Sequence, residues 1–139
     1  MSLKASEIER IGEGLKAATL PAAEFHHREH CLATAYFLMS EPNADWASEL
    51  PRIIRRYNLA MGGKNTESSG YHETITLFYL NSIAAFLSAL PRCSLAEACD
   101  ALLASPLAAK DYLARFYSAE LIASPRSRLR FVAPDIPRP

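Results

Sequence analysis

Apolar residues along this chain recur at intervals of three and four positions, which is the period of an amphipathic α-helix. The alternation of apolar and polar residues that marks a half-buried strand is nearly absent, β-branched residues are sparse, and Ala and Leu abound. The 139 residues suffice for one hydrophobic core and one domain. We therefore predict an all-α fold, a compact single-domain bundle of about six helices with an extended carboxyl-terminal arm.

The first two predicted helices are placed by a capping signal and by an apolar run. The segment SEIE opens the first helix, because Ser6 can act as its N-cap and Glu9 can complete a capping box. The second helix is predicted from about Glu24 to Met39. From Cys31 onward this segment is apolar nearly all round, which predicts a central position in the bundle.

A third helix and a long fourth one are separated by the most polar segment of the chain. Pro51 lies within the third and predicts a kink or a restart there. The segment GGKNTESSG, residues 62–70, predicts a loop, and the next helix is predicted from Tyr71 to Leu90. Because this loop directly precedes His72, we expect it to border any pocket there. The third helix carries a regular inward stripe of apolar residues: Trp46, Leu50, Ile54, Tyr57 and Met61.

The last third of the chain predicts shorter elements. A second capping box in SLAE opens a helix at Ser94, and Pro106 opens a further one. Residues 125–139 are rich in Pro and Arg and are predicted to form an extended tail packed on the bundle. Residues 1–139 are thus read as one helical domain, in which residues 1–3 could be a remnant of cloning.

Three of the four histidines lie in the segment EFHHREH. At about 100° per residue, His27 and His30 share one stripe of their helix with Thr34, and His26 lies at the edge of that stripe. His27 and His30 are one turn apart, so their Cβ atoms are about 5–6 Å from each other. Two imidazoles at this spacing can converge on one ligand.

The fourth histidine, His72, is predicted to point inward from the start of the 71–90 helix, one turn before Thr76. The dipole at a helix N-terminus disfavours protonation and keeps the imidazole neutral, as a metal or a general base requires. Glu73 lies at the edge of the same face and could be a metal ligand, an orienting group or a cap. Tyr71 and Glu73 are the predicted catalytic residues.

The favoured hypothesis is a divalent metal site of catalytic type formed by His27, His30 and His72. Imidazole nitrogens bind Zn, Ni or Fe, and a Zn–N bond is about 2.0–2.1 Å long. Three protein ligands with an open fourth position would activate water or a substrate oxygen. Each histidine could instead be a core residue hydrogen-bonded to a neighbour.

Two other hypotheses need no metal. One is a pocket for a small polar or anionic molecule, in which the histidines and Tyr71 donate or accept hydrogen bonds and Lys64 or Arg55 neutralises charge. Thr34 and Thr76 are the further residues predicted to contact such a ligand. The other is a homodimeric interaction module without a small-molecule site.

The charge balance and the cysteine content limit the classes of binding partner and the cellular compartment that we expect. Fifteen Lys and Arg balance fifteen Asp and Glu, which argues against a general nucleic-acid binder. Cys31, Cys93 and Cys99 show no C-x-x-C pairing and suit a reducing compartment. No apolar run approaches the roughly 20 residues that span a bilayer, and the start lacks the apolar stretch of a signal peptide. We expect a cytoplasmic protein that binds neither nucleic acid nor a membrane.

Four segments resemble a family of small uncharacterised bacterial proteins: FHHREHCLATAYFL, IIRRYN, GYHETITLFYL and FYSAELIASPRSRLRFVAPD. That family is all-helical, with an F/W-x-H-x-x-H helix, an I-R-R-Y-N segment and a G-Y-H-E-T block. The likeness runs from about Leu20 to Asp135, and the G-Y-H-E-T block is its most specific part. The resemblance implies His27, His30 and residues 71–74 as site residues and leaves His26 outside the pattern. The family has no assigned reaction, so the resemblance implies a site without its chemistry.

Overall fold

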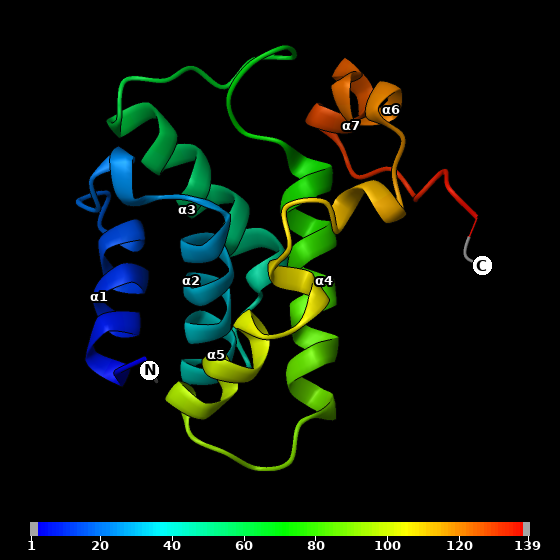
Figure 1. Ribbon diagram of the computed structural model, residues 1–139. Coiled ribbons are helices and arrows are strands. Elements are labelled where there is room, and N and C mark those ends of the chain that lie inside the picture. Colours follow the sequence, from blue (N-terminus) through cyan, green and yellow to red (C-terminus); the bar gives the residue numbers. More distant parts are fainter. Residues whose placement is uncertain (1–2, 138–139) are drawn as a thin grey trace.

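The computed structural model describes residues 3–137, and within them it contains only helices and connecting segments (Figure 1). This confirms the predicted all-α fold. Residues 1–2 of the presumed cloning remnant and residues 138–139 of the predicted tail lie outside the described part. The seven α-helices are α1 (Ala5–Lys16), α2 (His27–Ser40), α3 (Trp46–Ala60), α4 (Glu73–Ala89), α5 (Leu95–Leu103), α6 (Ala119–Ala123) and α7 (Pro125–Leu129). Three short 3₁₀ helices join them: η1 (Ala22–Glu24), η2 (Pro106–Ala108) and η3 (Leu113–Arg115).

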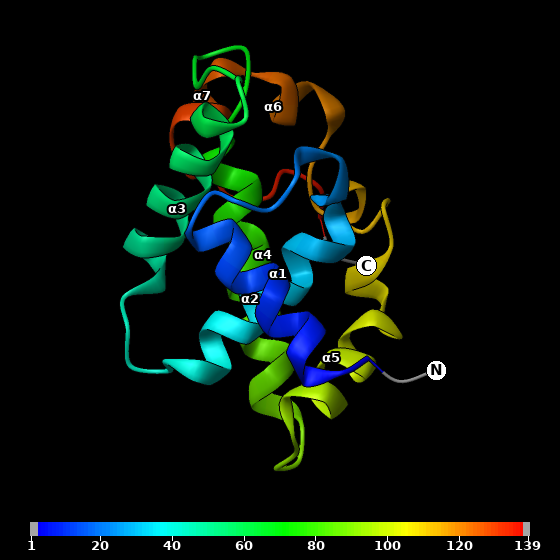
Figure 2. The same cartoon turned by 90° about the vertical axis from the view of Figure 1, so that its left-hand side faces the viewer.

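Helix α2 is the centre of the bundle. It packs against α1, α3, α4 and α5, and in Figure 1 it runs between α1 and α4, with α1 in front of it in Figure 2. Residues 31–35 of this helix are all buried, as its apolar sequence predicts. Thr34 is buried completely in this helix, while His27 and His30 in its first turn are partly buried.

Helices α2 and α4 both begin later than predicted, and in each case a histidine stands at the N-cap. Residues 22–24 form η1, and α2 starts at His27 after His26, whose backbone N–H donates to Glu29 Oε1 at 3.1 Å. Helix α4 starts at Glu73 after His72, whose Nδ1 accepts the Ile75 N–H at 3.2 Å. Sequence patterns place Ser, Thr, Asp and Asn at N-caps, so an imidazole cap gives little signal.

The predicted extended arm is wrong over its first five residues. Pro125–Leu129 form α7, because Ser124 Oγ accepts the Ser127 N–H at 3.2 Å and Pro125 takes the first helical position. The chain is non-helical only from Arg130 onward. Helix α7 packs on α4, and α6 and α7 lie at the amino-terminal end of α4 in both views (Figures 1 and 2).

Pro51 neither ends nor restarts α3, which continues to Ala60 with Pro51 buried inside it. Among the described residues no helix combines the length and the apolar character needed to cross a membrane.

One buried hydroxyl joins the last segment of the chain to α4, and it gives a first prediction. Thr74 Oγ1 donates to Arg130 O at 3.0 Å and accepts the Val132 N–H at 3.1 Å. Thr74→Val keeps the shape but leaves two backbone groups unpaired, so the free energy of unfolding should fall by about 2 kcal/mol. The matched control is Thr19→Val at an exposed position, with an expected change within about 0.5 kcal/mol. Urea denaturation measures both, and equal losses would contradict the assignment.

Candidate functional site

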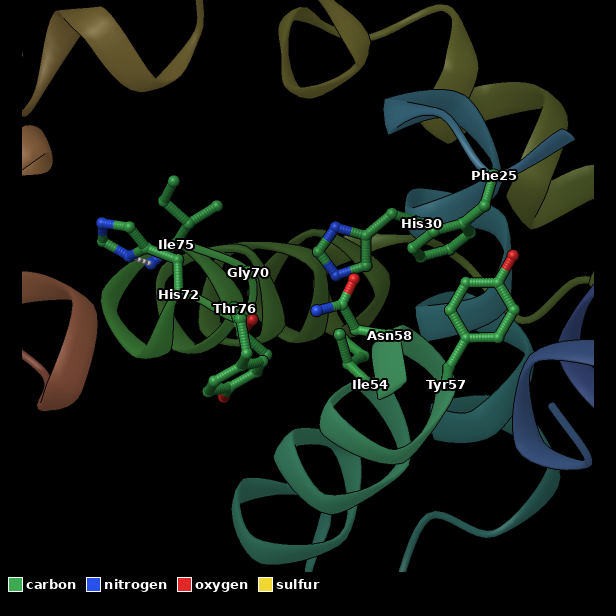
Figure 3. A pocket seen from close by; sticks show the side chains of 10 residues that line it. Phe25, His30, Ile54, Tyr57, Asn58, Gly70, His72, Ile75 and Thr76 are labelled. Atoms are coloured by element: carbon green, nitrogen blue, oxygen red, sulfur yellow. Dashed lines mark hydrogen bonds between the residues drawn. The ribbon is translucent and has the colours of Figure 1, made fainter. Parts of the chain in front are cut away.

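A cavity of about 250 Å³ lies where the starts of α2 and α4 face the carboxyl-terminal half of α3 (Figure 3). Its walls are mainly aromatic and aliphatic, and none of the lining residues carries a carboxylate. The lining residues are Phe25, His30, Ile54, Tyr57, Asn58, Gly70, Tyr71, His72, Ile75 and Thr76.

His30 supplies the unusual polar atom of this cavity. Its Nε2 is buried and has no hydrogen-bond partner within the described part of the chain. Burial, with a smaller contribution from the nearby His27, lowers the pKa of His30 to about 4. The imidazole is therefore neutral at pH 7. A buried polar atom without a partner costs about 1–3 kcal/mol, so this nitrogen lowers the free energy of unfolding as long as it stays unpaired.

His72 is 8% exposed, which confirms that it points inward, but both of its ring nitrogens are occupied. Nδ1 accepts the Ile75 N–H at 3.2 Å, so the proton sits on Nε2, which donates to Ile122 O at 2.8 Å. Burial lowers the pKa of His72; the hydrogen bond to Ile122 O raises it in part, and the charge of Arg128 lowers it. In Figure 3 the ring of His72 points away from His30. His72 thus forms part of the cavity wall as a helix cap.

His27 lies on the other side of the start of α2 and does not line the cavity. Its Nε2 is 2.9 Å from Leu107 O and 3.6 Å from Cys31 Sγ. The ring of Tyr79 stands beside both histidines, with centroids 4.8 Å from His27 and 6.2 Å from His30. His27 and His30 are one helical turn apart, but the ring of His27 bonds to Leu107 O whereas the ring of His30 lines the cavity.

The structure therefore separates the three predicted metal ligands. His27 and His72 bond to backbone carbonyls, whereas His30 Nε2 is buried without a partner among the described residues. Among the described residues, no group of three or more His, Cys, Asp or Glu side chains is placed to hold a metal ion. Metal binding remains a prediction that needs a rearrangement of these side chains.

The predicted catalytic pair forms one cluster at the edge of the cavity. The hydroxyl of Tyr71 donates to Glu73 Oε1 at 2.6 Å. Burial raises the pKa of Tyr71, and its bond to Glu73 raises it further, so the phenol keeps its proton. The Arg55 guanidinium lies 5.0 Å from the centroid of the Tyr71 ring, a cation–π arrangement. This cluster holds Tyr71 in place as a wall of the cavity.

The remaining predicted ligand residues divide into two groups. Thr76 lines the cavity and is buried. Thr34 is buried within α2, where its hydroxyl donates to His30 O at 2.8 Å, and it does not reach the cavity. The Lys64 side chain is exposed and also lies outside the lining, while its carbonyl accepts from Asn58 Nδ2 at 3.2 Å.

Two asparagines that sequence reasoning passed over attach the polar loop to α3. Asn58 lines the cavity, and its Nδ2 donates to Asn65 Oδ1 at 2.8 Å. Asn65 Nδ2 donates to Arg55 O at 3.0 Å, and its Oδ1 also accepts the Tyr71 N–H at 3.1 Å. Gly70 has φ 84°, and a Cβ there would overlap Lys64 O. The loop borders the cavity through Gly70, as predicted. Asparagines close to a glycine-rich segment are typical of turns, and this pattern could have indicated that Asn58 and Asn65 hold the loop.

Comparison with models of known protein families, with curated proteins and with solved structures gave no match. The resemblance described above stays a prediction. Function is therefore inferred from the geometry of the cavity.

The depressed pKa of His30 makes stability depend on pH. The unfolded chain takes up a proton near pH 6.5 and the folded one only near pH 4. Between these values the unfolded state binds more protons, so the free energy of unfolding falls as the pH is lowered. From pH 7 to pH 5, wild type should lose about 2 kcal/mol more than His30→Gln.

The control for this prediction is His26→Gln, which alters an exposed histidine and should keep the full pH dependence of wild type. Denaturant unfolding at the two pH values measures the effect, and an NMR titration reports the His30 pKa directly. If His30→Gln retained the wild-type pH dependence, the assignment of a neutral, buried His30 would be wrong.

Proposed function

We propose that the protein binds a small molecule in the cavity between α2, α3 and α4, without a metal, through a hydrogen bond to His30 Nε2. The observation that carries this proposal is the unpartnered, buried nitrogen in a largely apolar wall. Folding leaves few buried polar groups unsatisfied, and those that persist commonly serve a function. A ligand that bonds to Nε2 removes the cost of leaving it unpaired.

The aromatic and aliphatic residues of the wall indicate the shape of the apolar part of this ligand. The ring of Phe25 packs edge-on against Tyr57 with centroids 5.1 Å apart, and Ile54 and Ile75 add aliphatic surface. The Tyr57 hydroxyl is committed to Leu20 O at 2.8 Å, so this residue offers its ring rather than a polar group. A planar or branched apolar body suits these surfaces.

The polar groups of the wall indicate the polar part of this ligand and its charge. His30 is neutral at pH 7, and Thr76 adds a hydroxyl, whereas Asn58 Nδ2 is already committed to Lys64 O and Asn65 Oδ1. With no carboxylate in the wall, the cavity does not favour a cation. A volume of about 250 Å³ is at the small end of ligand pockets, so the enclosed part of the ligand is small.

The test uses benzyl alcohol as a neutral probe with an apolar ring and one hydroxyl. Its addition should shift the ring resonances of His30 and Tyr57 and raise the melting temperature. His30→Phe keeps a ring but removes both nitrogens, so the affinity should fall by roughly five- to tenfold. The same variant should be more stable than wild type without the probe, because the unsatisfied nitrogen is gone.

His26→Phe is the matched control and should leave the affinity unchanged, since His26 does not line the cavity. Probe binding that shifts neither His30 nor Tyr57 would contradict the proposal. A melting temperature that rises with Zn or Ni ions, falls back with a chelator and depends on His30 would support the metal hypothesis instead.

A further inference from the structure

A second cavity, which we call the basic groove, lies on the other side of the start of α2. Its volume is about 700 Å³. It is formed by the first residues of α2, by α4 and by the segment from η2 to η3. Its lining residues are His26, His27, Arg28, Ile75, Tyr79, Ala108, Lys110 and Leu113.

The two permanently charged residues that line the basic groove, Arg28 and Lys110, are both basic. Arg28 and Lys110 line it from different elements, and none of the eight lining residues carries a carboxylate. Two acids lie beside the groove: Glu29, whose Oε2 accepts from Arg28 Nη1 at 2.8 Å, and Asp111, which is next to Lys110 in the chain and acts on the lining residue Tyr79. The N-terminus of α2 adds to the positive potential on the same side. The groove therefore favours an anion.

The basic groove and the His30 cavity meet at Ile75, which lines both of them. The ring of Tyr79 lines the groove and lies 6.2 Å from the ring of His30, which lines the cavity. The partition between the two spaces is therefore about one side chain thick. Ile75 is the wall that the two spaces share, so a molecule that occupies both must run over the Ile75 side chain or displace it.

We infer that the ligand is an amphipathic anion, with its apolar body in the His30 cavity and a carboxylate or phosphate group in the basic groove. This inference rests on the proposed function and adds to it the charge of the ligand and the place where that charge lies. Arg28 and Lys110 are the residues that select the anion. This places the charge on the α2 side of the site, opposite the Arg55 and Lys64 side predicted from the sequence.

The experiment compares three probes with one ring in common: benzyl alcohol, phenylacetate and benzyl phosphate. Both anions should bind more tightly than the alcohol, and added salt should weaken only their binding. The double variant Arg28→Gln, Lys110→Gln should reduce the affinity for the anions by roughly fivefold and leave that for benzyl alcohol unchanged. Which anion loses more identifies the preferred group.

Lys64→Gln is the control, since it removes one exposed charge outside both cavities and should change nothing. If benzyl alcohol binds at His30 but the anions gain nothing, the inference is overturned and the proposed function stands. If Lys64→Gln or Arg55→Gln removes the preference for anions, the charge lies at the loop and the inference is also overturned. If no probe binds at His30, the proposed function itself fails.

Discussion

The imidazole of His72 joins the parts of the structure on which the site depends. Its Nδ1 caps α4 through the Ile75 N–H, and its Nε2 holds Ile122 O at the carboxyl-terminal end of α6. One neutral ring, with its tautomer set by these two bonds, thus fixes where α4 begins and how the last helices lie on it. Ile75 and Thr76 follow within one turn, so the wall of the His30 cavity inherits its position from this cap.

Helix α2 imposes the second constraint. It packs against four other helices, and its first turn carries His30 into an interior that disfavours the charged form of the imidazole. His27 meets a backbone carbonyl there and His30 Nε2 does not. Stability alone would favour an apolar ring at position 30. The imidazole nitrogen at this position lowers the stability of the fold, and in the proposed function it binds the ligand.

The two cavities differ in the groups that line them. The His30 cavity supplies aromatic surface and neutral hydrogen-bonding groups, and the basic groove supplies charge near solvent, where its desolvation costs little. The asparagines of α3 and of the loop keep the opposite wall in place through bonds to backbone groups of Lys64, Tyr71 and Arg55. The wall of the cavity formed by α3 and the loop is therefore held by hydrogen bonds to the backbone.

Local patterns in the sequence determined the helices, the central place of α2 and the inward direction of His72, because apolar periodicity reports which face of a helix is buried. They also placed the polar loop beside the cavity. The state of each imidazole was decided only by the tertiary structure. Leu107 and Ile122, 80 and 50 positions from the histidines they pair with, act through backbone carbonyls, which every residue has and no sequence pattern marks. For the same reason His30 could not be told from its neighbours: whether a carbonyl lies within reach of a ring nitrogen depends on how distant segments pack.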